Sequence, residues 1–237
     1  MADEQNQRVE MNIIGHVHTP FDDKFGIPRQ SGLVEDIPGE IVFCSEYRVP
    51  EAVRGLEDFD RIWILWQFSR AVRQEWSPTV RPPRLGGNKR MGVFATRSPF
   101  RPNAIGLSCV KLLGVEITPD RGPVLKIAGA DLLDGTPVFD IKPYIPYADS
   151  YPDAAAGFAA QAPVSNLTVV LPPNAEKMMG SAQMAQALRR VLEQDPRPRY
   201  QDDPERVYGF GFAGREIRFT VNGNVLTVQQ ITPKKLT

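Results

Sequence analysis

The chain has 237 residues, of which 42% are hydrophobic and 24% charged, a composition typical of a folded globular protein with a sizeable core. No apolar run is long enough to span a membrane, no secretory signal is visible, and two cysteines cannot build a disulfide scaffold, so a cytoplasmic location is expected. The 28 basic and 28 acidic residues cancel over the whole chain but not within it.

Seven short runs rich in Val, Ile, Leu, Phe and Trp fill the first two thirds of the chain, and Gly, Pro and Asp separate them. This pattern predicts β-strands. The runs are Val9–Val17, Glu40–Phe43, Arg61–Phe68, Met91–Ala95, Gly106–Ile117, Val124–Ala130 and Val138–Ile145. About seven strands with turns between them favour a closed barrel or a sandwich. A short helix that begins at Pro50 is expected between the second run and the third.

The last third has a different composition. A stretch rich in Ala, Pro and Asp from Tyr147 to Pro163 marks a boundary, which predicts one domain over residues 1–163 and a small α+β domain over 164–237. So small a unit is near the lower limit for independent stability, and we expect it to dock on the first domain or on a second copy of the chain. The fold class is therefore mostly β, and α+β overall.

Within this second domain, a strand at Leu167–Leu171 precedes an apolar stripe with helical spacing over Ala175–Gln194. Ser181, which follows Gly180, is an alternative start for a separate and shorter helix. Near the end of the chain, the Asn-Gly pair in Val221–Asn224 predicts a tight hairpin between two closing strands.

Positive charge is concentrated in the segment 70–101. This segment contains eight basic residues and one acidic residue, Glu75, and has a net charge of +7. A local field of this kind attracts polyanions. The alternative is a solvated loop whose arginines pair with the acidic first third of the chain. The basic residues are Arg70, Arg73, Arg81, Arg84, Lys89, Arg90, Arg97 and Arg101.

The stretch Gly92–Gly106, here called the arginine loop, carries two arginines, two prolines and Asn103 between apolar runs. Proline removes a backbone donor and fixes φ, so this stretch predicts a stiff loop rather than a central strand or a helix. Because arginine binds carboxylate and phosphate through paired hydrogen bonds, the loop predicts an anion-binding site.

Two further turns pair a proline with polar side chains after a strong strand: Phe25–Gly32, the Pro28 turn, and Leu132–Pro137, the Asp134 turn. Each by itself is an ordinary connection. Their shared character indicates loops at one rim of a barrel, where ligands bind.

Two other motifs are interpreted as carrying no chemistry. Gly209–Gly214 fits the G-x-G-x-x-G pattern, but a strand rather than a helix follows it, so a dinucleotide site is not expected. His16 and His18 share a strand face, but the chain has no other histidine, and no metal site or Ser–His–Asp triad is expected.

The turns and strands described above, with several neighbouring motifs, resemble the bacterial TsaA-like family of TrmO-type tRNA N6-adenosine methyltransferases. The resemblance extends over nearly the whole chain. The matching residues are Ile14-Gly15 with Thr19-Pro20, Pro28-Arg29-Gln30, Val53–Glu57, Trp63-Ile64-Leu65, Arg81–Gly87, Gly92–Gly106, Asp134–Pro137, Asp140–Tyr144 and Gln194–Tyr200. The resemblance implies a single-sheeted β-barrel that binds S-adenosyl-L-methionine, a homodimer, and a tRNA adenosine beside the anticodon that already carries an N6-threonylcarbamoyl group.

Carried over by position, the resemblance implies cofactor contacts in all three turns, just after the third predicted strand and at the start of the strand that follows the arginine loop. They are Pro28, Arg29, Gln30, Ser69, Arg70, Arg97, Leu107, Asp134, Gly135, Thr136 and Pro137. Ser69-Arg70 departs from the family, which has His-Gln after the corresponding phenylalanine, so side-chain contacts there are in doubt while backbone contacts would remain.

The implied reaction assigns roles to five residues. The urea-like N6 is a poor nucleophile while protonated, and Asp134 is the first candidate to accept its proton, with Asn103 as an orienting group. Arg101 or Lys142 supplies the cation for the threonyl carboxylate. Tyr144 stacks on the base or is simply packed. The basic segment, with Arg197 and Arg199, would hold phosphates.

Two alternatives stay open: an RNA-binding barrel without catalysis, and a methyltransferase that uses the same cofactor on a substrate other than tRNA. An RNA-binding barrel without catalysis would not bind S-adenosylmethionine, so a cofactor-binding assay tests the first alternative. Analysis of tRNA nucleosides tests whether the methyl group goes to tRNA or to another substrate.

Overall fold

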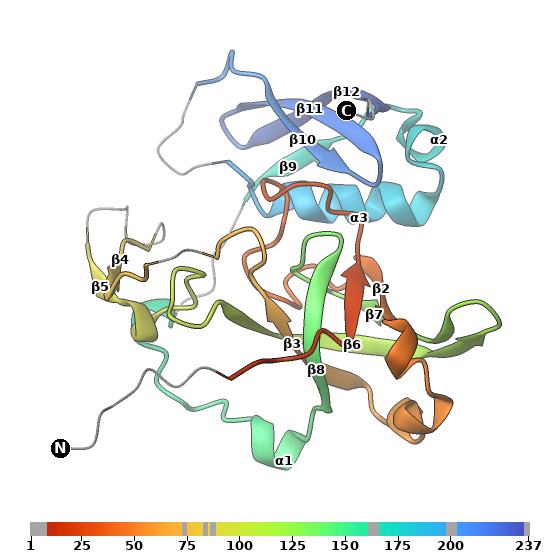
Figure 1. Ribbon diagram of the computed structural model, residues 1–237. Coiled ribbons are helices and arrows are strands. Elements are labelled where there is room, and N and C mark those ends of the chain that lie inside the picture. Colours follow the sequence, from red (N-terminus) through yellow and green to blue (C-terminus); the bar gives the residue numbers. More distant parts are fainter. Residues whose placement is uncertain are drawn as a thin grey trace.

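The computed structural model describes residues 9–72, 75–82, 85, 89–160, 166–197 and 203–234. Its larger unit is a closed barrel of six antiparallel strands in the spatial order β1-β2-β7-β6-β3-β8 (Figure 1). The strands are β1 (Gly15–His18), β2 (Pro38–Phe43), β3 (Arg61–Gln67), β6 (Ile105–Thr118), β7 (Gly122–Ala128) and β8 (Thr136–Pro143). The expected barrel is confirmed.

The barrel core follows from alternation along the strands. In β3 every second residue points inward, so that Ile62, Ile64 and Trp66 are buried while their neighbours are only partly covered. Val17, Ile41, Val110, Leu125, Ile127 and Val138 from the other strands complete this core.

The seventh predicted strand is not part of the barrel. Only Met91–Gly92 of the run Met91–Ala95 forms a strand, β5, and it pairs with β4 (Thr79–Val80) in a separate two-stranded sheet. Val93–Ala95 turns into a 3₁₀ helix, η5. The run has one buried anchor, Val93, and therefore lacks the inward-facing row that a barrel strand needs.

The N-terminal run is shorter as a strand than predicted. β1 begins at Gly15, although the backbone of Ile14 already bonds Val138 and Cys44. Val9, Met11 and Ile13 are exposed, so this part of the run contributes nothing to the core. Likewise, the helix expected at Pro50 consists of two 3₁₀ turns, η2 (Pro50–Val53) and η3 (Leu56–Asp58), which Gly55 separates with a φ of +83°.

The register of the barrel brings three long connections to the same end. Antiparallel pairing aligns the end of β1 with the starts of β2 and β8, the end of β3 with the start of β6, and the end of β7 with the start of β2. The Pro28 turn, the arginine loop and the Asp134 turn all belong to these connections. This end is called the loop end of the barrel below.

The C-terminal unit is a four-stranded sheet in the order β10-β11-β12-β9, with helices α2 (Ala175–Met179) and α3 (Ala182–Glu193). Its strands are β9 (Thr168–Val170), β10 (Tyr208–Phe212), β11 (Arg215–Asn222) and β12 (Val225–Pro233). In Figure 1, α3 lies between this sheet and the barrel. Short elements α1 (Pro146–Asp149), η1 (Ser45–Tyr47) and η6 (Gly157–Ala159) complete the fold.

Two local predictions for this unit are confirmed. Gly180 has a φ of +87° and ends α2, and the hydroxyl of Ser181 accepts the amide N–H of Met184 at 3.1 Å as the cap of α3. The separate-helix alternative is therefore the right one. Asn222 pairs with Val225 across a tight hairpin in which Gly223 has a φ of +58°.

The C-terminal unit docks on the barrel through the connection between β1 and β2. Phe21, Val34 and Ile37 are buried in the same apolar cluster as Leu188, Phe212 and many other residues of the C-terminal unit. Phe21 forms an isolated antiparallel β-bridge with Phe212, and the carboxylate of Asp23 accepts the amide N–H of Gly211 at 2.6 Å. Three residues that the sequence analysis assigned to the first domain therefore lie in the core of the C-terminal unit. None of the helices in the described ranges has the length and apolar character needed to cross a bilayer.

Candidate active site

The Pro28 turn and the arginine loop are joined at the loop end. Pro28 is buried, whereas Arg29, Gln30 and Arg97 are exposed. A guanidinium N–H of Arg97 donates to Oε1 of Gln30, across 67 positions of sequence. Two residues predicted to contact the cofactor from separate turns thus meet directly.

A chain of polar contacts links β3, β6 and the residues that follow β7 near the loop end. The indole N–H of Trp66 donates to Oγ of Ser108 at 3.0 Å, and that hydroxyl donates to Oδ1 of Asp131 at 2.6 Å. Burial raises the pKa of the Asp131 carboxyl, which the Ser108 hydroxyl, its nearest backbone donors and the positive charge of Arg97 partly offset. The positive charge of Arg97 therefore acts on the Asp131 carboxyl.

The Asp134 turn projects the one carboxylate expected to act in the chemistry. Oδ1 of Asp134 lies 3.2 Å from Nδ1 of His18 and accepts the amide N–H of Thr19, also at 3.2 Å. Both side chains of the His18–Asp134 pair are 47% exposed, so the carboxylate is positioned yet open to a ligand.

The rest of this turn supports Asp134. Gly135 has a φ of +75°, a left-handed conformation that favours glycine, and its N–H bonds the carbonyl of Val17. Thr136 is buried and its hydroxyl donates to the carbonyl of Leu133 at 2.7 Å, while Pro137 pairs with His16 in the barrel wall. The side chain of Thr136 is consequently structural.

Ser69, Arg70 and Leu107 lie beside the start of the arginine loop. Ser69 and Arg70 are exposed directly after β3, and the carbonyl of Arg70 accepts Nζ of Lys24 at 3.3 Å. Leu107 points outward from β6 and is 52% exposed, opposite Leu65 on β3. An exposed leucine on a barrel wall provides an apolar surface for a planar group.

The candidates for substrate binding divide into two groups. Asn103 is exposed at the loop end, just before β6. Arg101 is half-buried, and its Nη1 donates to the carbonyls of Thr96 and Ser98 at 3.0 and 3.4 Å. It braces the arginine loop, although the other N–H groups of the guanidinium are not used in these bonds.

Lys142 and Tyr144 lie far from Asp134 within the same chain. Lys142 lies six positions along β8 from Thr136, about 20 Å at the rise of a strand, and pairs with Asp140 at 2.8 Å. Tyr144 packs at a tilt on Trp63, with ring centroids 5.9 Å apart. Both residues follow the wall of the barrel away from the loop end, because the pairing of β8 with β3 fixes that direction.

Arg197 has a structural role. Its side chain is 11% exposed and forms a 2.9 Å ion pair with Asp195, which excludes it as an open phosphate ligand. Arg73, Arg84 and Arg199, also predicted to contribute positive charge, lie outside the described residues.

The sequence interpretation missed three site residues. His18 was assigned no chemistry, and Asp131 and Ser108 were not considered. For His18 the available signal was its place next to Thr19-Pro20, at the end of the strand before the Pro28 turn. The contacts of Asp131 depend on residues far away in sequence and have no local signal.

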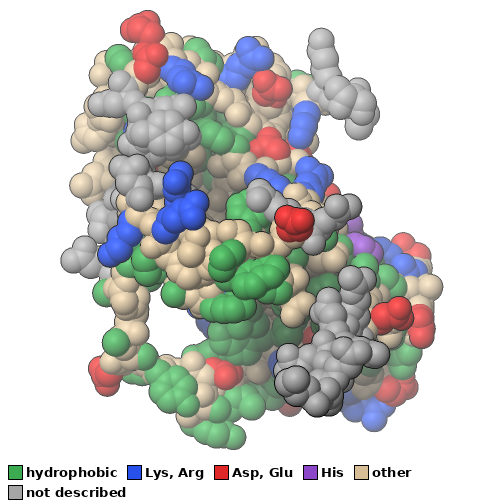
Figure 2. Space-filling view, turned by 60° about the vertical axis from the view of Figure 1, so that its left-hand side comes forward, with side chains coloured by type: hydrophobic (Ala, Val, Ile, Leu, Met, Phe, Trp, Pro, Cys, Tyr) green, Lys and Arg blue, Asp and Glu red, His purple; other side chains and the backbone are tan. Residues whose placement is uncertain are grey.

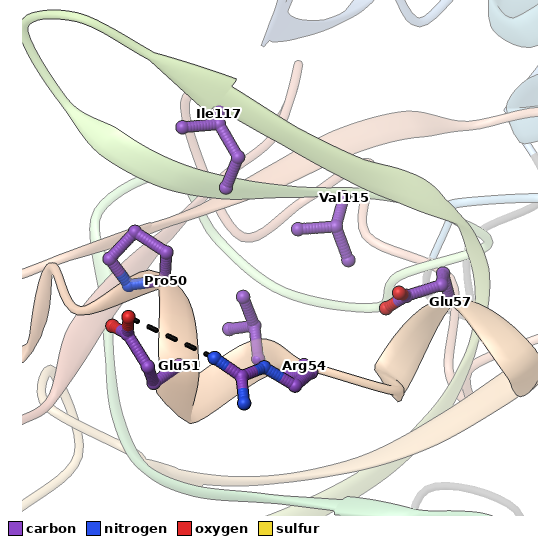
Figure 3. A pocket seen from close by; sticks show the side chains of 7 residues that line it. Pro50, Glu51, Arg54, Glu57, Val115 and Ile117 are labelled. Atoms are coloured by element: carbon purple, nitrogen blue, oxygen red, sulfur yellow. Dashed lines mark ion pairs between the residues drawn. The ribbon is translucent and has the colours of Figure 1, made fainter.

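A shallow pocket of about 360 Å³ lies elsewhere, at the opposite end of the barrel. Pro50, Arg54, Val115 and Ile117 are among its lining residues, and Figure 3 shows the Glu51–Arg54 ion pair at its rim. None of the predicted site residues lines it. Its charged lining residues, Glu51, Arg54 and Glu57, are open to solvent and include one exposed 3.9 Å ion pair, so it is a surface hollow beside η2 and β6 rather than a built site.

The described ranges contain no group of histidine, cysteine or acidic side chains that could hold a metal ion.

Comparison with known proteins decides the family. A sequence model described as the tRNA-methyltransferase O N-terminal domain matches residues 16–150, and the TrmO C-terminal domain matches residues 165–234. The chain belongs to the TrmO family. The family assignment made from the turns and strands is confirmed.

Individual TrmO relatives match over most of their length. The chain is 44% identical to the tRNA (adenine(37)-N6)-methyltransferase of Escherichia coli K12, over 93% of this chain and 97% of that protein. A crystal structure of TrmO from Pseudomonas aeruginosa superposes with a TM-score of 0.80 at 31% identity, covering 96% of this chain and 100% of that one. A probable S-adenosyl-L-methionine-binding protein of Pyrococcus abyssi is 38% identical over 57% of this chain and 68% of its own.

Proposed function

We propose that this TrmO-family protein transfers a methyl group from S-adenosylmethionine to N6 of adenosine 37 in tRNA, and that the adenosine accepted is the N6-threonylcarbamoyl form. The name of the Escherichia coli relative supports the reaction and the position. The single structural observation that carries the proposal is the meeting of the Pro28 turn, the arginine loop and the Asp134 turn at one end of the barrel.

The residues at the loop end fit the cofactor. S-adenosylmethionine presents a carboxylate, an amine, a sulfonium and an adenine ring, and when bound it supplies an electrophilic methyl group. Arg29, Gln30 and Arg97 offer exposed donors for a carboxylate, Leu107 offers an apolar surface for a ring, and Asp134 offers negative charge. No metal is required for this transfer, because the methyl group is already activated by the positive sulfur.

Asp134 is proposed to take the proton from the attacking nitrogen. When the methyl group moves to N6, its bond to sulfur would break and leave the electron pair on sulfur as a neutral thioether. N6 would become more acidic as it gains the methyl group, and its proton would pass to a carboxylate oxygen of Asp134. His18 and the Thr19 amide hold Oδ1 of this group at 3.2 Å, so Oδ2 is the oxygen proposed to face the substrate. His18 is thus a positioning residue for Asp134.

Arg101 is the proposed partner of the threonyl carboxylate, because Lys142 lies about 20 Å along β8 from the Asp134 turn. Its Nη1 is used by loop carbonyls, and the rest of the guanidinium supplies the charge. An adenosine without this carboxylate would leave the cation unpaired and would be rejected. The expected homodimer is part of the proposal, since Lys142 and Tyr144 can reach an Asp134 only from a second copy.

Nucleoside analysis of tRNA tests the proposed reaction. In a strain lacking the gene, mass spectrometry should show loss of the N6-methyl derivative of threonylcarbamoyl-adenosine and accumulation of its precursor. Persistence of the methylated nucleoside would refute the assignment to tRNA. Sedimentation of the purified protein tests the homodimer, and its cytoplasmic location stays a prediction.

A further inference from the structure

An exposed aromatic pair, Trp76 before β4 and Phe94 after β5, flanks the small sheet that these strands form, and the proposed chemistry does not use it. The rings of Trp76 and Phe94 stack with centroids 6.0 Å apart and planes 28° from parallel. The two residues are 50% and 71% exposed. Large aromatic side chains are usually covered, so two stacked and open rings indicate a surface that binds something.

The pair is held by a fixed backbone. Thr79 pairs with Gly92 and Val80 with Met91, and the N–H of Val93 bonds the carbonyl of Pro78 at 2.9 Å. Val93 is buried and anchors the strand that leads to Phe94. A surface ordered before binding loses little entropy when a ligand arrives.

One cation lies over one of these rings, and three more belong to the same segment of the chain. The guanidinium of Arg101 lies over the Phe94 ring, 6.0 Å from its centroid, and Arg90 donates to Oγ1 of Thr79 at 3.3 Å. Arg81 and Lys89 are exposed on the same segment. In the part of the chain that the structure describes, none of these four side chains forms an ion pair with a carboxylate. The alternative in which the basic segment is neutralised by the acidic first third is not observed for them.

The arrangement lies beside the proposed active site. Phe94 is three positions before Arg97, which bonds Gln30, and Arg101 braces the loop between them. Figure 2 brings this side of the molecule forward and shows mostly blue among the charged side chains in its middle, with hydrophobic side chains close by. One carboxylate, that of Glu75, adjoins Trp76 in sequence.

We infer that Trp76 and Phe94 form a stacking platform for an unpaired base of the RNA strand next to the target adenosine. Stacked aromatic rings with neighbouring cations are how proteins hold single-stranded nucleic acid, since every base has a π-face and every phosphate a charge. An apolar protein partner would leave the cations without counter-charges, so the charge favours RNA. The inference rests on the proposed function, because an anticodon loop supplies such unpaired bases.

Binding of an anticodon stem-loop RNA to the full-length protein tests the platform. Trp76→Ala and Phe94→Ala should each weaken the affinity about 5- to 100-fold, the range seen when a stacking residue is removed. Trp76→Phe should retain affinity within about threefold, since it keeps a ring. A fully paired RNA duplex without a loop should bind all variants alike. Phe59→Ala, an aromatic substitution at the opposite end of the barrel, is the matched control.

Tryptophan fluorescence provides a readout independent of activity. Stacking of a base on Trp76 should quench emission when the stem-loop binds the wild type, and Trp76→Phe should lose this quenching while still binding. Unchanged affinity for the stem-loop in both alanine variants would overturn the inference, and this is the result expected if the rings bind a protein partner instead. Full quenching in Trp76→Phe would overturn it as well.

Failure of the platform differs from failure of the reaction. If the wild type methylates tRNA and the alanine variants leave KM for tRNA unchanged, the platform is wrong and the enzyme assignment stands. If stem-loop binding depends on both rings but no methyl group reaches tRNA, the platform stands and the proposed reaction is wrong.

Discussion

Asp134 and His18 lie 116 positions apart and yet form a 3.2 Å contact at the loop end of the barrel. Each is an ordinary polar residue at the end of a strand or in a turn. The contact arises because β1 pairs with β8, so that the end of β1 and the turn before β8 come together. A carboxylate that is held by two neighbours but half-exposed suits proton transfer better than structural support.

Replacement of Asp134 by alanine should leave the fold intact and lower turnover. Loss of a general base typically costs 10²- to 10⁴-fold in rate, and we expect kcat to fall within about this range. Steady-state kinetics and thermal unfolding of the same preparation measure both effects. His18→Gln should give a smaller loss of kcat, since Thr19 still bonds the carboxylate. An Asp134→Ala protein that fails to fold would assign the residue a structural role.

Asp131 has no counterpart among the residues predicted from sequence. Its carboxylate is mostly buried, accepts the Ser108 hydroxyl and interacts electrostatically with Arg97, which in turn donates to Gln30. Because burial penalises its charge, the carboxylate is retained at some cost to stability. This cost is reasonable if the charge positions Arg97 for the cofactor.

Asp131→Asn should therefore raise KM for S-adenosylmethionine about two- to fivefold and leave kcat unchanged, because Arg97 is exposed and its attraction to Asp131 is screened. The amide keeps the size of the side chain and an oxygen acceptor for Ser108. Isothermal titration calorimetry should show a similar increase in the dissociation constant of S-adenosylmethionine for the variant relative to the wild type. Asp120→Asn, in the exposed turn between β6 and β7, is the control. An equal fall in kcat and kcat/KM would instead place Asp131 in the reacting step.

At the scale of elements, the strands of the barrel were predictable and the sheet β4–β5 was not. Barrel strands have one inward-facing apolar row, a pattern local to each segment. β4 and β5 comprise two residues each, and only their pairing across the basic segment makes them a sheet. A run of similar composition, Met91–Ala95, was therefore mistaken for a seventh barrel strand.

Cross-strand ion pairs reinforce the middle of the barrel wall. Glu40 on β2 bonds Lys126 of β7 at 2.7 Å and Arg121, at the start of β7, at 2.6 Å. The hydrogen bond from Lys126, followed by that from Arg121, lowers the pKa of the Glu40 carboxyl from its ordinary value of 4.5, against the opposing effect of burial. The pKa of Lys126 is raised by the same contact.

The stability lost in Glu40→Gln should depend on pH. A carboxyl whose folded pKa is lowered stabilises the fold above the ordinary value of 4.5 and loses this effect as pH falls through the lowered pKa. We expect the variant to be less stable by about 1 kcal/mol at pH 7 and equal to the wild type well below pH 4. Urea unfolding at both pH values measures this. A difference that is the same at both would contradict the ion-pair account.

At the scale of the whole molecule, the connection between β1 and β2 joins three things: the barrel, the C-terminal unit and the Pro28 turn. Phe21, Val34 and Ile37 lie in the core of the C-terminal unit, while Gln30 reaches Arg97 in the candidate active site. The C-terminal unit therefore stabilises the backbone that carries the predicted cofactor contacts.

Phe212→Ala tests this coupling. Phe212 is fully buried and lies edge-to-face on Phe21, with ring centroids 5.6 Å apart. Its truncation should cost about 3 to 5 kcal/mol of unfolding free energy and weaken S-adenosylmethionine binding, although Phe212 lies in the C-terminal unit. Chemical denaturation and calorimetric titration measure the two effects. Leu113→Ala, which removes an exposed side chain on β6, should change neither. Destabilisation with unchanged cofactor affinity would show that the units are not coupled.

The sequence by itself determined the strands of the barrel, the break between α2 and α3 at Gly180-Ser181, the closing hairpin and the family. Each depends on a short local pattern: alternation of apolar residues, a left-handed glycine beside a cap, or a contiguous motif. The residues of the three turns were identified in the same way, and their convergence at one rim was expected from the barrel as a whole.

Only the tertiary structure decided which of those residues meet. Strand register placed His18 against Asp134, and it carried Lys142 and Tyr144 away along β8. The closure of the barrel brought Asp131 into electrostatic interaction with Arg97, and docking of the C-terminal unit buried Phe21. These contacts join positions tens to nearly two hundred residues apart, and hydrogen bonding between strands, unlike local propensity, has no signature within either segment alone.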